Sequence, residues 1–253
     1  KWLDTPSNFR ISGSERIRYE GLDGQFRDNN TRDVEDQVFS RLLLRADYTH
    51  EQWGATVEGM DARAWGTKAD SFANTTTVNT LDVLQANMSW KSDDGHSVTV
   101  GRYTMDIGSR RLSARNRYRN TINSFTGIDI DWKSKSGTEL RVFWTLPVRR
   151  QPTSLGQLRD NKIQDDEEDF DLQFWGVYAA TSLTKVERGE LFLFGLHEKD
   201  EPSRVTRKRD LFTPGFRVFR KPASDSLDYT LETAFQVGRS RSTKGGPRLD
   251  HFA

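Results

Sequence analysis

The chain has 253 residues, of which 34% are hydrophobic, 30% charged and 11% aromatic, and its 38 basic and 37 acidic residues leave a net charge of +1. A soluble domain typically has about 45–50% apolar residues, Gly included, so this chain has too few to fill a large solid core, whereas its aromatic residues argue against disorder. The composition therefore favours a shell around water, while the absence of Cys excludes disulfides and thiol chemistry, and the absence of an apolar run of about 18 residues excludes a transmembrane helix.

The first predicted element, residues 8–20, alternates between two kinds of side chain. Its odd positions are mostly apolar with a single Glu, and its even positions are all polar. This period of two predicts a β-strand with one apolar and one polar face. Residues 38–49 repeat the pattern, with Phe39 and Leu43 as apolar exceptions on the polar face.

Further alternating segments follow along the chain, and the clearest are residues 53–60, 97–100, 139–146 and 229–237. We count about eleven such segments and the beginning of another, each about 10 residues long, which is the length that a tilted strand needs to span a bilayer. Aromatic residues near strand ends are typical of membrane interfaces. Here they are Tyr19, Tyr48, Trp53, Trp65, Trp90 and Trp132.

The connections between these segments alternate in length. Short ones are predicted at residues 50–52, 91–95, 135–137, 184–189 and 221–226, and long ones at residues 21–37, 66–76, 108–120, 148–171 and 199–210. This alternation predicts an all-β, antiparallel up-and-down transmembrane β-barrel with tight periplasmic turns and a first strand that runs outward. Soluble sandwiches, lipocalin-like barrels and propellers also contain alternating strands, with the polar face outside. The strand length, the charged polar faces and the regular loops favour the membrane barrel.

Arginine is concentrated in one predicted loop. Residues 107–128 contain no acidic residue but several arginines, namely Arg110, Arg111, Arg115, Arg117 and Arg119. Planar guanidinium groups bind carboxylates and phosphates, and rings of them in a narrow pore select anions. The segment is therefore predicted to fold into or over the lumen. A solvated outer loop, or one that binds lipopolysaccharide phosphates, explains the same composition and stays open.

More arginines lie on or near the polar faces of the predicted strands, namely Arg16, Arg18, Arg41, Arg45, Arg63 and Arg141. They strengthen the pore interpretation. Alternatively, they pair with inward Glu58, Glu139 and Glu232 and so hold the geometry of the barrel. Both roles are compatible, because some arginines can be paired while others stay free.

Other chemistry has less support. The acidic run over residues 165–171 offers oxygen ligands for Ca²⁺, but its spacing does not match an EF-hand, and a solvated loop is the better interpretation. Ser97 and His96 are neighbours on a strand and point to opposite faces, which excludes a catalytic dyad. No hydrolase or phosphate-loop motif occurs, no cofactor is implied, and the near-zero net charge argues against nucleic-acid binding.

Several stretches resemble the alginate export family of outer-membrane proteins. The most specific is GRYTMDIGSRRLSARNRYRNTINSFTG at residues 101–127, supported by RIRYEGLDGQFR at 16–27, LLLRADYTH at 42–50 and VNTLDVLQA at 78–86. The resemblance implies a large monomeric barrel of about eighteen strands in outer-membrane lipid, with an arginine constriction that passes an anionic polyuronate. On this resemblance, the candidates for the constriction are Arg45, Arg102, Arg110, Arg111, Arg115 and Arg141.

The chain departs from the family pattern at its end. It stops at DHFA after about eleven strands, whereas the last strand of a barrel normally closes against the first. We therefore predict a single barrel domain over residues 1–253 that is truncated at its C-terminus, with a smaller barrel of about twelve strands as the alternative. The predicted function is a channel for anionic saccharides, not an enzyme. A plugged barrel that binds surfaces through its loops and, with less support, an outer-membrane hydrolase stay open.

Overall fold

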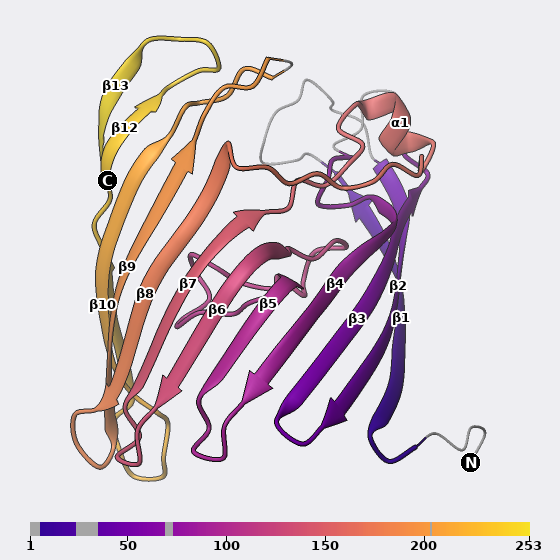
Figure 1. Ribbon diagram of the computed structural model, residues 1–253. Coiled ribbons are helices and arrows are strands. Elements are labelled where there is room, and N and C mark those ends of the chain that lie inside the picture. Colours follow the sequence, from indigo (N-terminus) through magenta and orange to yellow (C-terminus); the bar gives the residue numbers. More distant parts are fainter. Residues whose placement is uncertain (1–5, 24–34, 69–72, 203) are drawn as a thin grey trace.

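The computed structural model of the chain describes residues 6–23, 35–68, 73–202 and 204–253. They form one 13-stranded antiparallel sheet, curved like a barrel wall (Figure 1). Consecutive strands lie side by side, except that β11 and β12 both pair with β10. Within the described residues, β1 and β13 occupy the two edges of the sheet and do not pair with each other. The elements are β1 (Phe9–Leu22), β2 (Glu35–His50), β3 (Trp53–Trp65), β4 (Asn79–Lys91), β5 (Ser97–Tyr103), β6 (Phe125–Lys133), β7 (Glu139–Pro147), α1 (Leu155–Arg159), β8 (Leu172–Ser182), β9 (Glu187–Glu198), β10 (Asp210–Arg220), β11 (Tyr229–Ala234), β12 (Val237–Arg241) and β13 (Arg248–Phe252).

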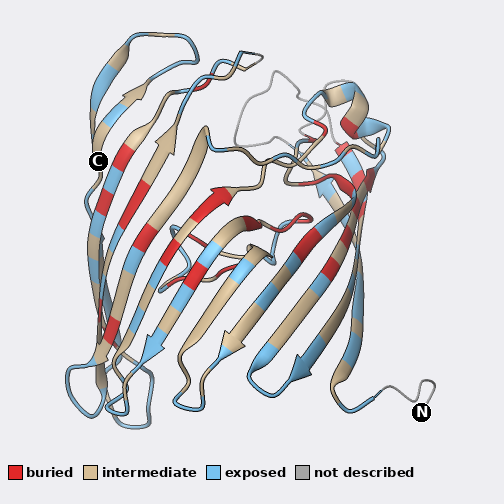
Figure 2. Ribbon diagram, viewed as in Figure 1, coloured by how far each residue is buried: buried red, intermediate tan, exposed pale blue. Residues whose placement is uncertain are grey.

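Large apolar side chains on one face of the strands stay exposed. Ile17 is 70% exposed, and Leu44 and Val57 are each 58% exposed. A soluble sandwich or lipocalin-like barrel would bury this face in its core. The wall of a membrane barrel instead turns apolar residues outward and polar residues inward. Figure 2 shows exposed residues alternating with less exposed ones along many of the strands.

The connections follow the predicted alternation. Tight turns gather at one end of the sheet and long connections at the other (Figure 1). For example, β2 ends at His50 and β3 begins at Trp53, whereas β7 ends at Pro147 and β8 begins at Leu172. Parts of the first two long connections, at residues 24–34 and 69–72, lie outside the described residues. The sequence therefore predicted the up-and-down order of the sheet correctly.

One predicted strand is divided in the structure. Residues 229–237 form β11 and the beginning of β12, and both pair with β10 in one continuous register. The break lies opposite Thr213 and Pro214, and proline has no N–H with which to continue the ladder. The Phe235 N–H still donates to the Pro214 carbonyl oxygen at 2.9 Å. The two pieces therefore behave as one interrupted strand.

The two apolar exceptions on β2 are covered by loops and neighbouring side chains. Phe39 is fully buried and packs in a cluster with Val78 and with Leu158 of α1. Leu43 packs against a second cluster that contains Ile122, from the connection between β5 and β6. The protein thus builds its small apolar core between the wall and the loops. No helix in the described part of the chain is long and apolar enough to cross a membrane.

Candidate functional site

The connection between β5 and β6 turns back into the concave side of the sheet (Figure 1). This inward segment, residues 104–124, contains no strand or helix. Asn120 anchors it, because the residue is only 1% exposed and its Nδ2 donates to the carbonyl oxygens of Ser40, Arg63 and Thr77 at 2.9, 3.2 and 2.8 Å. One amide therefore joins the segment to β2, to β3 and to the connection before β4. Sequence reasoning missed Asn120, because nothing local marks it as an anchor.

Arginines on the wall hold the same segment through its backbone. Arg16 donates from Nη2 to the Arg119 carbonyl oxygen at 2.8 Å and from Nη1 to the Arg117 carbonyl oxygen at 3.0 Å. Arg41 donates to the carbonyl oxygens of Arg119 and Arg117 at 3.0 and 3.3 Å, and Arg18 donates to that of Tyr118 at 3.0 Å. Carbonyl oxygens satisfy the hydrogen bonds of a guanidinium without neutralising its charge.

Arg16 and Arg41 also lie directly opposite each other across β1 and β2. Like charges in that position weaken strand pairing. Among the described residues neither side chain forms an ion pair, although Arg18 pairs with Glu20 at 2.7 Å. An arrangement that costs stability in this way is hard to explain by barrel geometry alone and indicates a role for the positive charge.

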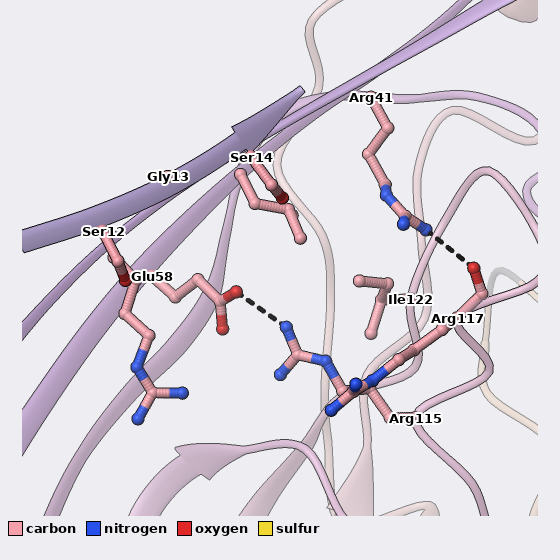
Figure 3. A pocket seen from close by; sticks show the side chains of 10 residues that line it. Ser12, Gly13, Ser14, Arg41, Glu58, Arg115, Arg117 and Ile122 are labelled. Carbon is pink, nitrogen blue, oxygen red and sulfur yellow. Dashed lines mark hydrogen bonds and ion pairs between the residues drawn. The ribbon is translucent and has the colours of Figure 1, made fainter. Parts of the chain in front are cut away.

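A hollow of about 350 Å³ opens between this wall and the inward segment (Figure 3). We call it the arginine hollow. It is lined by Ser12, Gly13, Ser14, Arg41, Leu43, Arg45, Glu58, Arg115, Arg117 and Ile122.

The lining of the arginine hollow contains more cations than anions, since Glu58 is the only acidic residue among the described residues that line it. Arg115 pairs with Glu58 through Nη2 and Oε1 at 2.7 Å, and the two side chains are 13% and 4% exposed. Arg45 pairs with Asp47 at 2.7 Å. Within the described residues, Arg41 and Arg117 have no acidic partner. The hollow therefore retains unbalanced positive charge.

The structure brings two of the predicted constriction residues, Arg45 and Arg115, to the same hollow. The others lie elsewhere on the concave face. Arg102 is held by Asp82 at 3.4 Å and Glu168 at 2.5 Å. Arg141 pairs with Asp129 and donates to the Asp106 carbonyl oxygen at 3.0 Å.

Arg110 and Arg111, by contrast, project from the inward segment with side chains that are 68% and 74% exposed. Their carboxylate partners, Asp106 and Glu232, are each 3.5 Å away.

The inward acidic residues take different partners. Glu58 lies opposite Arg45 in the register of β2 and β3 but pairs with Arg115 of the inward segment. Glu139 pairs with Arg188 on β9 at 2.9 Å. Some acidic residues thus tie strands to one another, and others fasten the inward segment to the wall.

The acidic run over residues 165–171 folds onto the protein. Asp166 accepts hydrogen bonds from the Gln151 N–H and from Asn79 Nδ2, both at 2.8 Å, while Glu168 binds Arg102. Burial and the neighbouring charge of Asp82 raise the pKa of Asp166 to about 6. The N-terminal part of the run therefore docks the connection between β7 and β8 onto β4 and β5.

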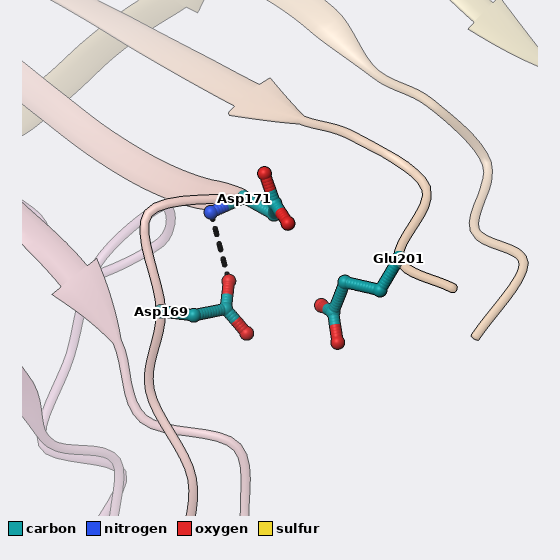
Figure 4. A group of neighbouring side chains, drawn as sticks. All are labelled: Asp169, Asp171 and Glu201. Carbon is teal, nitrogen blue, oxygen red and sulfur yellow. Dashed lines mark hydrogen bonds between the residues drawn. The ribbon is translucent and has the colours of Figure 1, made fainter. Parts of the chain in front are cut away.

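Asp169, Asp171 and Glu201 are the described acidic residues that come close enough to share a metal ion (Figure 4). Arg149 already contacts this group, since its Nη2 pairs with Asp169 and lies 3.3 Å from Glu201 Oε1. The hydrogen bond from Arg149 holds the pKa of Asp169 below its usual value. The guanidinium supplies the positive charge that these carboxylates need.

Comparison with known proteins complements this geometry. The family model described as alginate export matches residues 8–248. The chain belongs to the alginate export family. A search of curated proteins found no match. Membership of this outer-membrane transport family gives the chain a role in transport across the outer membrane.

Proposed function

We propose that this member of the alginate export family is a channel of the bacterial outer membrane that passes anionic saccharides, of which a polyuronate such as alginate is the type, through its arginine hollow. The observation that carries the proposal is the charge of the hollow. Arg41 and Arg117 line it without acidic partners in the described residues, and Arg16 beside them donates from its Nη atoms to backbone carbonyl oxygens. We further expect a monomer surrounded by outer-membrane lipid and lipopolysaccharide.

The physical chemistry of guanidinium suits this role. It is permanently charged, weakly hydrated and presents planar donors that match a carboxylate. Fixed cations around a confined space attract anions and raise their local concentration. Conduction also requires that each site release its ion, and side chains that already have carbonyl acceptors bind a passing carboxylate without holding it too tightly.

The test is the ion selectivity of the intact protein in a planar bilayer under a salt gradient. The wild type should conduct, with a reversal potential that shows anion preference, and an added oligouronate should block the current. The double variant Arg41→Gln, Arg117→Gln should lose much of the preference and the block. Arg239→Gln is the control, because that arginine is 61% exposed and pairs with Asp250 on β13, away from the hollow.

Unchanged selectivity in the double variant would contradict the proposal, as would a cation preference in the wild type. A second function also has an observation in its favour. The inward segment is fastened across the concave face by Asn120 and the wall arginines, as in a plugged barrel that binds surfaces through its loops. No conductance from correctly inserted protein would support that function.

A further inference from the structure

The other half of the concave face is aromatic. Phe143, Phe174 and Phe194 come from β7, β8 and β9, and their ring centroids lie 5.1 to 5.9 Å apart. Phe125 of β6 lies 6.1 Å from Phe174, and Phe192 stacks on Phe194 at 5.0 Å. The strand register places the rings of β7 to β9 on one face, since Phe143 and Phe194 both lie opposite Gly176. Arg141 shares this face of β7 by alternation, so these rings line the concave side.

Close approach of the rings depends on a missing side chain. A Cβ added at Gly176 would lie 2.4 Å from the Phe194 ring and 2.8 Å from the Phe143 ring. The two rings therefore occupy the space that a side chain at Gly176 on β8 would fill. Met105 and Ile107 of the inward segment cover Phe143 and Phe194, whereas Phe174 and Phe192 stay partly exposed. The result is an apolar cluster on the face where a water-filled barrel carries polar residues.

A second hollow, of about 250 Å³, opens beside these rings. We call it the aromatic hollow. Its lining includes Phe125, Phe174, Phe194, Leu112, Thr213 and Gln236. Gln236 Nε2 donates to Thr213 Oγ1 at 2.9 Å, so one edge of an otherwise apolar hollow carries hydrogen-bonding groups.

Positive charge lies next to the aromatic hollow. Leu112 belongs to the inward segment and directly follows Arg110 and Arg111. The acidic partners of these two arginines are 3.5 Å away, and the arginine side chains are 68% and 74% exposed. Glu232 is only 11% exposed and also accepts from Ser109 Oγ at 2.6 Å, so it keeps a partner without Arg111. At 3.5 Å neither carboxylate holds its exposed guanidinium tightly, so both arginines can turn toward an incoming anion.

We propose that the aromatic hollow is a sugar-ring subsite, which binds the apolar C–H face of a pyranose whose carboxylate is held by Arg110 or Arg111. The inference rests on the proposed function and deepens it, because it distinguishes a sugar acid from other anions. A pyranose has apolar faces and a polar rim. Stacking against an aromatic ring satisfies the faces, and the Thr213–Gln236 edge satisfies the rim. A lipid chain would leave that edge and both arginines without a role.

The two hollows then have different kinetic effects on a uronate chain. Exposed and unbalanced arginines act at long range and set the rate of association, which falls with added salt. Ring stacking acts only at contact and therefore sets the rate of dissociation. A substitution that removes one ring face should shorten the time for which an oligouronate blocks the channel, without changing how often it enters.

The experiment compares Phe174→Leu with Phe192→Leu. Both residues are half-buried members of the same cluster, but only Phe174 lines the aromatic hollow. Block of single-channel current is recorded with an oligouronate of defined length and with a neutral gluco-oligosaccharide of the same length. Phe174→Leu should shorten the blocked time for the oligouronate by about 3- to 10-fold at unchanged entry rate and ion selectivity. Phe192→Leu should leave it unchanged.

Equilibrium binding of the same oligouronate to detergent-solubilised protein compares the wild type and the two variants without measuring current. The dissociation constant should rise by the same factor by which the blocked time falls. The neutral oligomer should bind more weakly to the wild type but lose affinity in Phe174→Leu as well. Equal effects of the two substitutions, or none from Phe174→Leu, would overturn the subsite and leave the rings as packing. A wild-type channel without anion selectivity would instead overturn the proposed function, so the two failures are distinguishable.

Discussion

The arginine half and the aromatic half of the concave face use the same inward strand positions for opposite purposes. On β1 and β2 these positions hold Arg16 and Arg41, which donate to backbone carbonyl oxygens. On β7 to β9 they hold rings that satisfy one another. The inward segment faces both halves, with Arg115 in the first hollow and Leu112 in the second. The difference shows that one part of a barrel wall can attract an anion by charge while another part recognises the shape of the same solute.

The largest effect is expected from breaking the ion pair that fastens the inward segment on the arginine side. Glu58→Gln leaves the buried guanidinium of Arg115 uncompensated, and breaking such a pair costs about 3–5 kcal/mol. The variant should therefore unfold at lower urea concentration. Its reversal potential should shift toward stronger anion preference, because one negative charge has left the hollow.

Glu139→Gln is the matched control for this change. Glu139 also pairs with an arginine, Arg188, but its side chain is 39% exposed, and such pairs contribute about 0–1 kcal/mol. Equal loss of stability in the two variants would contradict the prediction that burial of the Glu58–Arg115 pair makes its loss more costly.

A somewhat smaller effect is expected from pH at the acidic connection that covers the arginine side. The folded pKa of Asp166 is raised from 3.8 to about 6, so its contribution to stability is fully present below about pH 4 and is lost as pH rises through 6. The difference of about two pH units corresponds to about 3 kcal/mol at most. Of the charged groups around it, Asp82 raises this pKa and Arg150 lowers it.

Asp166→Asn should remove this part of the pH dependence. Hydrogen-exchange protection factors of residues 148–171 between pH 4 and 8, which correct for the base-catalysed intrinsic rate, measure it directly, since the wild type should lose protection above pH 6 and the variant should not. Asn79, whose Oδ1 has no hydrogen-bond partner among the described residues, can turn its amide to accept from the new side chain. Parallel pH profiles for the two proteins would refute the assignment to Asp166.

The smallest effect is expected on the aromatic side. Gly176→Ala introduces a Cβ into the rings of Phe143 and Phe194, and overpacking of this kind costs about 1–3 kcal/mol. Urea unfolding measures the loss. Gly156→Ala in α1 is the control, because nothing lies within 4 Å of its added Cβ. Ion selectivity should be unchanged in both variants, and a change in Gly176→Ala would mean that the two halves are not separable.

The sequence by itself determined the architecture of this protein. Period two is a local property of an extended chain, since successive side chains point to opposite faces, and loop length is read directly from the spacing between strands. The arginine-rich residues 107–128 were also recognisable, as was the alternative that some arginines are paired.

Only the tertiary structure decided which charges stay unbalanced. Arg16 and Arg119 are 103 residues apart in the chain, and Arg115 and Glu58 are 57 apart, so no local pattern predicts either contact. The same holds for Phe39 under α1 and for the break in the last predicted strand, which is set by Pro214 on the neighbouring strand. A strand pattern says which face a residue lies on, whereas its partner depends on which distant segment folds against that face.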